Sequence, residues 1–326
     1  MHARRCRGEG QTERTVLRRA RPDPAIEHAG TETGLEDHRR RALSAAFAAL
    51  RPQQWTKNLL VFAGIVFAAE LGDAVRWLEA IACFAAYCAA SSAAYLVNDV
   101  RDQEADRAHP TKRRRPIASG ELATRTAMWL AVVLAAVAVA LVVPLGPGSL
   151  ALLSAFAALQ LGYTLGLKHV VLVDVFAIAA LFVVRATAGA VAVEVPISPW
   201  LYLCTGLLAL FLALGKRRAE HVLVESRETP GRRVLDGYTV PLIDQFVSIV
   251  ASATIVAYAL YTFTAHDSKA LMITIPYVVF GIFRYLLLLH RQVAGEEPEQ
   301  VLLRDLPILT AVSAWAVTCA VVLALD

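Results

Sequence analysis

Residues 77–106 read WLEAIACFAAYCAASSAAYLVNDVRDQEAD, an apolar run that ends in a cluster of acids. The apolar part, 77–98, has the ~20 residues that a helix needs to cross the hydrocarbon core of a bilayer. Asp99, Asp102 and Asp106 follow at spacings i, i+3 and i+7, so a helix places all three on one face. This stretch predicts a membrane-spanning helix that presents acidic side chains at one membrane surface.

The rest of the chain repeats the apolar pattern. Its residues are 57% hydrophobic and only 18% charged, whereas about a quarter of the residues in a soluble domain are charged. The chain contains nine apolar runs in all. The first of them is interrupted by polar residues, and the sixth is short. We therefore predict an all-α, polytopic membrane protein with nine transmembrane helices, at 58–75, 77–98, 122–143, 148–166, 170–193, 199–214, 240–262, 271–289 and 306–325.

Lysine and arginine residues are unevenly divided between the two sides of this topology. Of the 32 in the chain, 28 fall on the side of the N-terminus, and only Arg76 and Lys269 fall on the other. The remaining two, Arg185 and Arg284, lie inside predicted spans. Because cytoplasmic loops are enriched in Lys and Arg, we expect the N-terminus in the cytoplasm, the C-terminus outside, and the protein in the cell (plasma) membrane.

The N-terminal segment, 1–45, differs from the rest. It is rich in Arg, Glu, Thr and Gly and contains no long apolar run, so we predict a disordered cytoplasmic tail. Its arginines are also suited to contact anionic lipid headgroups. The segment lacks the apolar centre of a signal peptide. Across the whole chain the five cysteines form neither a CxxC pair nor a Cys/His pattern, which argues against a disulfide framework or a zinc site.

The acidic cluster has the composition of a metal site. Carboxylates this close repel one another unless a cation lies between them, and magnesium is usually held by one or two carboxylates together with substrate phosphates. Lys112-Arg-Arg-Arg115 follows at once and offers bases for phosphate oxygens. The alternative is a solvated acidic helix end. Ionisable clusters at membrane spans are usually functional, so we predict Mg²⁺ held by Asp99, Asp102 and Asp106.

The acidic stretch also resembles a known family motif. NDVRDQEAD (98–106), followed by HPTKRRRPIASG (109–120), is similar to the first aspartate-rich motif of the UbiA-type intramembrane prenyltransferase superfamily. A closer similarity, from about residue 48 to the C-terminus, is to the branch of decaprenyl-phosphate 5-phosphoribosyltransferases of actinobacterial cell-wall synthesis. It rests on RPQQWTKNLLVFA (51–63), YTLGLKH (163–169) with Asp174, RATAGA (185–190), GKRRAE (215–220), GEEP (295–298) and LRD (303–305).

The resemblance implies a UbiA-type transmembrane transferase domain at 46–326, with helices around a central cavity open to the cytoplasmic side. Most members carry a second aspartate-rich motif after the sixth span, but residues 215–225 are basic first and contain no DxxxD. That departure favours 5-phosphoribosyl 1-diphosphate as donor and decaprenyl phosphate as lipid acceptor, giving the lipid-linked ribose precursor of cell-wall arabinan. A conventional prenyltransferase with a prenyl diphosphate donor and a transporter of lipid intermediates remain alternatives.

The predicted partners are therefore the membrane, the polyprenyl phosphate lipid and the phosphoribosyl donor, with no nucleic acid; a homo-oligomer is compatible with the sequence. The catalytic and metal-binding candidates are the three aspartates. The substrate-binding candidates are Gln54, Lys57, Asn98, Lys112, Arg113, Arg115, Tyr163, Lys168, Asp174, Arg185, Lys216 and Arg217. A snorkelling role for Lys168, a buried structural role for Arg185 and a helix–helix contact for Arg284 are open alternatives.

Overall fold

The computed structural model describes residues 42–67, 72–109, 111–196, 198–227, 233–264, 269–291, 301 and 304–325. The chain divides into two units, Met1–Ser44 and Ala45–Asp326, and the second contains all the helices named in this section. The predicted tail, 1–45, lies almost wholly outside the described residues, so its disorder stays a prediction. Within the described ranges the chain is helical and contains no strand.

The described chain contains 3₁₀ segments as well as α-helices. The 3₁₀ segments are η1 (Pro52–Phe62), η2 (Lys112–Arg114), η3 (Val143–Leu145), η4 (Leu167–His169), η5 (Arg233–Gly237) and η6 (Ala270–Thr274). The α-helices are α2 (Ala63–Phe67), α3 (Ala74–Arg101), α4 (Gln103–Ala108), α5 (Pro116–Ser119), α6 (Thr124–Val142), α7 (Pro147–Leu165), α8 (Val173–Ala192), α9 (Pro199–Arg227), α10 (Val240–Thr264), α11 (Ile275–His290) and α13 (Leu306–Leu325).

Seven helical segments of the described chain are long and apolar enough to cross a membrane. They are Ala74–Arg101, Thr124–Leu145, Pro147–Leu165, Val173–Ala192, Val240–Thr264, Ala270–His290 and Leu306–Leu323. The multi-pass prediction is confirmed, but the count of nine is not. The first predicted span falls on η1 and α2, where polar residues interrupt the apolar pattern and the backbone begins as a 3₁₀ helix. The sixth falls within α9, whose second half is charged.

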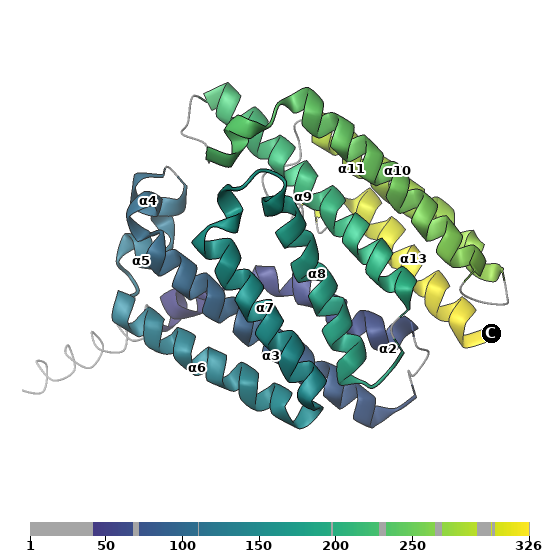
Figure 1. Ribbon diagram of the computed structural model, residues 1–326, viewed down its shortest axis with the longest axis horizontal. Helices are drawn as coiled ribbons and strands as arrows, with labels where there is room; N and C mark the ends of the chain where they lie inside the picture. Colours follow the sequence, from purple (N-terminus) through teal and green to yellow (C-terminus); the bar gives the residue numbers. More distant parts are fainter. Residues whose placement is uncertain are drawn as a thin grey trace, which may run out of the picture. The chain divides into compact units, whose positions relative to one another are not determined.

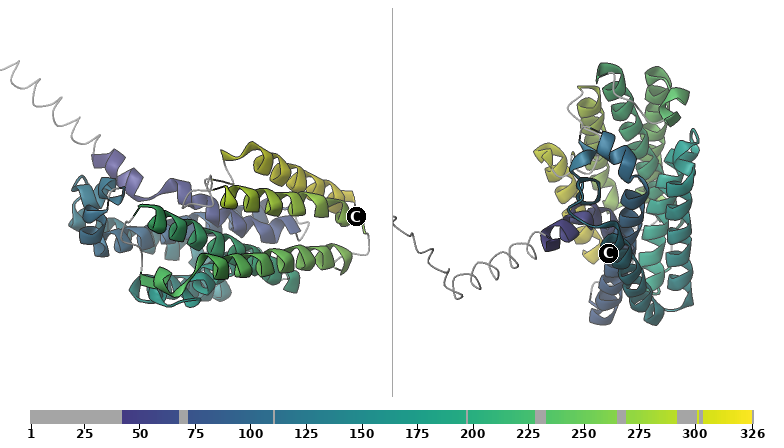
Figure 2. Two further views of the ribbon diagram at one scale, coloured as in Figure 1. Left: turned by 90° about the horizontal axis from the view of Figure 1, so that it is seen from above. Right: turned by 90° about the vertical axis from the view of Figure 1, so that its left-hand side faces the viewer.

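The long helices lie side by side in a common direction (Figure 2). Neighbouring pairs are α3 with α6, α7 with α8, α8 with α9, α9 with α10, and α11 with α13 (Figure 1). Large apolar side chains such as Trp129, Ile249 and Val317 point outward from these helices, while alanines fill many inner positions. That distribution suits a bundle in lipid, where small residues let helices approach closely and outward apolar side chains meet acyl chains.

Segment η1–α2 is packed against α8 through glycine. A Cβ atom added to Gly189 would lie 1.8 Å from the carbonyl oxygen of Val61, and one added to Gly64 would lie 2.6 Å from Cα of Ala190. Only a residue without a side chain permits this backbone-to-backbone approach. The contact fixes η1 beside α8, and so it places the residues that precede η1 next to the end of α3.

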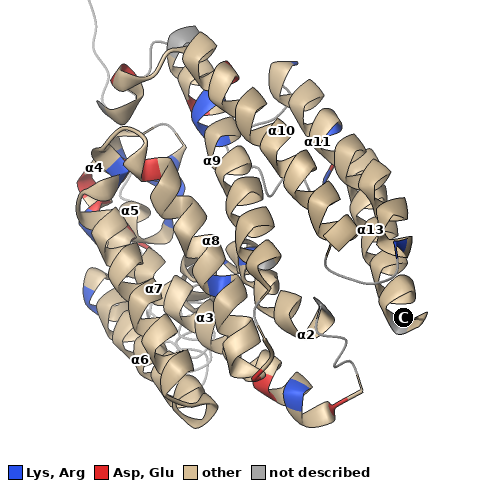
Figure 3. Cartoon of the chain, turned by 45° about the vertical axis from the view of Figure 1, so that its right-hand side comes forward, with Lys and Arg blue, Asp and Glu red and all other residues tan. Residues whose placement is uncertain are grey.

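Charged residues are concentrated where α3 ends and α4 and α5 begin, and along the second half of α9 (Figure 3). A smaller group, Asp73, Arg76 and Glu79, marks the start of α3. Asp73 caps α3 by accepting hydrogen bonds from the backbone N–H groups of Val75 and Arg76. The helix thus begins at a capped end and carries its acidic cluster at the other.

Candidate active site

The acidic stretch forms a broken helix. Helix α3 ends at Arg101, and Asp102 joins it to α4 with φ −89° and ψ 9° while its N–H still bonds the carbonyl of Asn98 at 2.9 Å. The hydrogen bond from the N–H of Asp106 to the carbonyl of Asp102, 2.8 Å, restarts the helix. The one-face prediction therefore holds as far as Asp102, and Asp106 belongs to a second short helix.

Two of the three aspartates are buried and paired with arginine. The Nη2 atom of Arg51 donates to both carboxylate oxygens of Asp99, at 2.6 and 2.9 Å. The Nη1 atom of Arg115 bridges Asp99, at 3.2 Å, and Asp106, at 2.6 Å. Arg51 also lies over the ring of Tyr95, 5.0 Å from its centroid. Residues from before η1 and after α4 thus neutralise the end of α3.

Asp102 is the accessible member of the cluster. Its side chain is 31% exposed, against 3% for Asp99 and 7% for Asp106. Lys168 of η4 donates to it at 3.2 and 3.5 Å, and the amide of Asn98 donates at 3.2 Å. Lys168 is far from the acids along the sequence, and the fold brings it to them.

The donor set fits a divalent cation that also binds phosphate. Across the described ranges, no three Asp, Glu, His or Cys side chains converge as a ready-made metal cluster. Magnesium does not require one, because it takes one or two carboxylates and completes its octahedron with waters and substrate oxygens. Asp102, with the side-chain amide of Asn98 beside it, offers such a partial set. Each acid is paired with a basic side chain of a type that also donates hydrogen bonds to phosphate oxygens.

The basic run after α4 divides into two roles. Lys112, Arg113 and Arg114 form η2, where both arginines are exposed and Lys112 is half-buried. Arg115 turns inward to the acids. Gln54 and Lys57 are half-buried on η1, and Lys216 is half-buried on α9. None of these placements decides a substrate contact, so their binding roles stay predictions.

A second ion-pair network lies fully inside the protein. Asp174, at the start of α8, accepts from Nε of Arg217 at 2.5 Å and from the hydroxyl of Tyr238 at 2.9 Å. Arg217 also pairs with Glu220 and donates to the hydroxyl of Tyr163 at 3.1 Å. The side chains of Arg217 and Asp174 are 1% and 0% exposed. The fold thus engages three predicted substrate ligands with one another.

Arg185 lies deeper, inside α8, and contacts different partners. Its Nε donates to Oδ1 of Asn58 at 2.8 Å, and its guanidinium lies 4.8 and 5.3 Å from the ring centroids of Phe156 and Phe182. The amide of Asn58 in turn donates to Sγ of Cys88 at 3.3 Å. Polar and aromatic groups of η1, α3, α7 and α8 therefore solvate this buried cation.

A match to a known family places these contacts in context. A model of the UbiA prenyltransferase family matches residues 59–304. The chain belongs to this family. Decaprenyl-phosphate phosphoribosyltransferase of Mycobacterium tuberculosis (strain ATCC 25618 / H37Rv) is 37% identical over 278 residues, which cover 83% of this chain and 91% of that protein. Decaprenyl-phosphate phosphoribosyltransferase of Mycolicibacterium smegmatis is 35% identical over 288 residues, covering 84% and 90%.

A solved UbiA structure shows the same fold. The UbiA homolog from Archaeoglobus fulgidus bound to GPP and Mg²⁺ superimposes with a TM-score of 0.68, covering 86% of this chain and 99% of that one at 16% identity. The family resemblance predicted from NDVRDQEAD is thereby confirmed, as is the assignment to a transferase family of membrane proteins.

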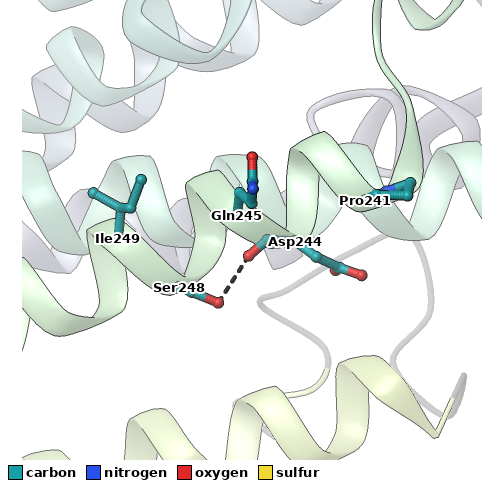
Figure 4. Close-up of a pocket in the computed structure, with 5 residues that line it drawn as sticks. All are labelled: Pro241, Asp244, Gln245, Ser248 and Ile249. Atoms are coloured by element: carbon teal, nitrogen blue, oxygen red, sulfur yellow. Dashed lines mark hydrogen bonds between the residues drawn. The ribbon is translucent and has the colours of Figure 1, made fainter.

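The UbiA chain also has a surface depression on one helix, lined by Pro241, Asp244, Gln245, Ser248 and Ile249 of α10 (Figure 4). The hydroxyl of Ser248 donates to the carbonyl of Asp244 at 2.8 Å, which is a contact within the helix. No residue of the acidic cluster lines the depression. It is not the predicted central cavity, which stays a prediction.

Reasoning from sequence missed three site residues of this UbiA protein. Arg51 lies in the RPQQW motif, but because it precedes the first predicted span it was counted only among the basic residues on the cytoplasmic side. Glu220 ends the GKRRAE motif, at i+3 from Arg217, which is a spacing that pairs charges on a helix. Tyr238 had no signal, because its partners lie far away along the chain. Arg284, whose role the sequence left open, contacts Asp305 at 2.9 Å and so joins α11 to the start of α13.

Proposed function

We propose that this chain transfers the 5-phosphoribosyl group of 5-phosphoribosyl 1-diphosphate to decaprenyl phosphate, releases diphosphate, and so makes a lipid-linked ribose precursor of cell-wall arabinan. The observation that carries the proposal is the acidic cluster, whose carboxylates are each paired with a basic side chain at one end of a membrane bundle. Support for the ribose donor comes from relatives 35–37% identical over most of both chains.

The acidic cluster is the proposed diphosphate site. Asp99, Asp102 and Asp106 would hold magnesium. Asp102 is the most accessible of these three aspartates. When bound, the ion supplies positive charge for the departing diphosphate. The chain's own contribution is a rigid frame: α3 and α4 place the acids, and burial of Asp99 and Asp106 against Arg115 keeps them in register.

The basic residues around the cluster are proposed to exchange partners when the donor arrives. Arg51, Arg115 and Lys168 now bond carboxylates, and all three keep a partly exposed side chain that can turn to phosphate oxygens. The remaining proposed phosphate ligands are Lys57, Lys112, Arg113 and Lys216. Asn98, Gln54, Tyr163, Asp174, Arg185 and Arg217 are proposed to line or frame the substrate space.

The reaction itself would be a direct displacement. An oxygen of the lipid phosphate forms a bond to C1 of the ribose while the bond from C1 to the diphosphate oxygen breaks, and the electron pair leaves with the diphosphate. Attack from the opposite face inverts the anomeric centre. The acceptor is already an anion, so the protein needs no strong general base. Positioning and charge neutralisation by the basic residues would supply most of the acceleration.

The proposed site faces the cytoplasm, where a water-soluble donor is available. The charge asymmetry of the loops supports an N-terminus in the cytoplasm of a cell (plasma) membrane protein. Cysteine labelling tests this orientation: a cysteine introduced at exposed Arg113 should react only with reagents that reach the cytoplasmic side. Labelling from outside intact cells would reverse the proposed topology.

The decisive test uses purified protein and two substrate pairs. One reaction contains decaprenyl phosphate and labelled 5-phosphoribosyl 1-diphosphate, and the other contains a prenyl diphosphate and an aromatic acid. We expect labelled lipid from the first pair, only with Mg²⁺ present and abolished by EDTA, and no prenylated aromatic acid from the second pair. Product only from the second pair would identify a conventional prenyltransferase. Product from neither would reject the enzymatic proposal.

A further inference from the structure

The loop that carries Lys168 is held from a distance. Lys168 belongs to η4, in the connection between α7 and α8, and its ammonium group reaches Asp102. The connection ends at Leu172, which has φ 67° and ψ −43°. A bulky residue with positive φ is strained, and such strain persists only where surrounding contacts impose it. Something outside the loop must therefore fix its shape.

Tyr238, which follows η5 between α9 and α10, supplies those contacts. Its hydroxyl accepts the backbone N–H of Leu172 at 2.8 Å and donates to Asp174 at 2.9 Å. The ring is 2% exposed. Burial raises the pKa of Tyr238 to about 12, so the hydroxyl keeps its proton and stays a donor near neutral pH. One hydroxyl thus ties the end of the Lys168 loop to the first turn of α8.

Gly237, next to Tyr238, packs against the same loop. A Cβ atom on Gly237 would lie 2.4 Å from Cγ2 of Val171, so η5 is packed directly on the residue before Leu172. The φ of Gly237 is not positive, so an alanine there would be opposed by the Val171 side chain, which would have to shift, and not by backbone conformation. Asp174, the other partner of the hydroxyl, is itself fixed by Arg217 of α9.

We propose that Tyr238 is a positioning residue for the reaction: by bonding Leu172 and Asp174 it sets the shape of the 166–172 loop and so holds Lys168 at Asp102. Tyr238 then controls how well the acidic site binds the donor diphosphate, although its hydroxyl bonds Leu172 and Asp174 and not Asp99, Asp102 or Asp106. The inference rests on the proposed function for its assay, since the donor is the ligand whose affinity is measured.

The first test is a double-mutant cycle on purified full-length protein. Tyr238→Phe removes only the hydroxyl, and we expect KM for 5-phosphoribosyl 1-diphosphate to rise about fivefold, the effect of one or two lost hydrogen bonds, with kcat changed less than about twofold. Lys168→Met should raise KM further. Because both act through one ammonium group, the double variant should match Lys168→Met alone. Additive effects would overturn the proposal.

A matched tyrosine separates positioning from stability. Tyr258 of α10 is also buried and bonds the hydroxyl of Thr274 and the indole N–H of Trp315. Tyr258→Phe removes a comparable hydroxyl, so it should lower Tm as Tyr238→Phe does but leave KM unchanged. Equal KM effects of the two variants would reduce Tyr238 to a packing role and contradict the proposal.

A size swap provides an independent test without touching the hydroxyl. Gly237→Ala should push the loop at Val171 and raise KM for the donor, and Val171→Ala should make room again. We expect the double variant Gly237→Ala with Val171→Ala to recover most of the lost affinity, while Val171→Ala alone has little effect. Failure of rescue in a folded double variant would overturn the proposal. Absence of product from the wild-type protein would instead reject the proposed function.

Discussion

The two clusters of acids and arginines in this protein have similar composition and opposite environments. Around Asp99, Asp102 and Asp106 the basic side chains are 14–27% exposed and come from three separate segments. Around Asp174 the guanidinium of Arg217 is 1% exposed and also pairs with Glu220. In the proposed mechanism the first cluster exchanges its partners for metal and phosphate, whereas the second would leave a charge buried if it did so.

The difference teaches that residue type alone does not assign a role here. By sequence, Arg217 and Lys168 fall in the same category, as basic residues beside membrane spans. The exposure of the side chains separates them, since a phosphate ligand must reach substrate while a buried ion pair stabilises the fold. Substitutions in the two clusters test that separation.

The largest expected effect is on stability. Arg217→Met should destabilise the protein by about 3–5 kcal/mol, because the carboxylate of Asp174 stays buried without its cation. Thermal unfolding in detergent measures the loss. Arg113→Met, on an exposed side chain, is the control and should leave Tm unchanged. A double variant of Arg217→Met with Asp174→Asn should be less damaging than Arg217→Met alone; an equal Tm drop from both arginine variants would erase the distinction between the clusters.

The acidic cluster should respond in the opposite manner. Asp102→Ala should lower kcat by about 100-fold or more while Tm stays near that of the wild type, because the accessible carboxylate serves charge neutralisation and not the frame. Glu104→Ala, on the neighbouring exposed acid, is the matched control. Retention of most activity in Asp102→Ala would remove Asp102 from the proposed metal site.

Arg51 tests whether a residue of the accessible cluster is exchangeable. Arg51→Met should lower kcat/KM for the phosphoribosyl donor about tenfold, as expected for a lost charge-assisted contact. Gln53→Ala, exposed on the same segment, should have no effect. If Arg51→Met lowered Tm as strongly as Arg217→Met but left kcat/KM intact, Arg51 would have a structural role and not a substrate-binding one.

The smallest effect concerns the half-buried pair of Arg284 and Asp305. The hydrogen bond from Arg284 holds the pKa of Asp305 below its usual 3.8. A depressed carboxyl pKa stabilises the folded state above the unfolded pKa, and that contribution is lost as pH falls through the folded value. Asp305→Asn should therefore lower Tm slightly at pH 7, and this difference from the wild type should shrink as pH falls below 3.8 and through the folded pKa. A difference that grew at low pH would contradict this ion pair.

Part of the site could be predicted from the sequence alone. The acidic motif, its family and the basic run beside it follow from local spacing, because Asp99 and Asp102 are one turn apart on a helix. The partners of those acids do not, since Arg51 and Lys168 are 48 and 66 residues away from them along the chain. The count of nine spans stays a prediction, because seven described helices meet the length and composition of a membrane span, while 58–67 begins as the 3₁₀ helix η1 and 68–71 lie outside the described residues.

The sequence by itself determined that this is a multi-pass helical membrane protein of the UbiA family with an acidic helix end, because hydropathy and motif spacing are local properties of the chain. Tertiary structure alone decided which charges are buried. It turned Asp174 and Arg217 to each other, placed Arg185 on Asn58, and set Lys168 against Asp102. Burial and pairing depend on which distant segments pack together, and no local pattern encodes that.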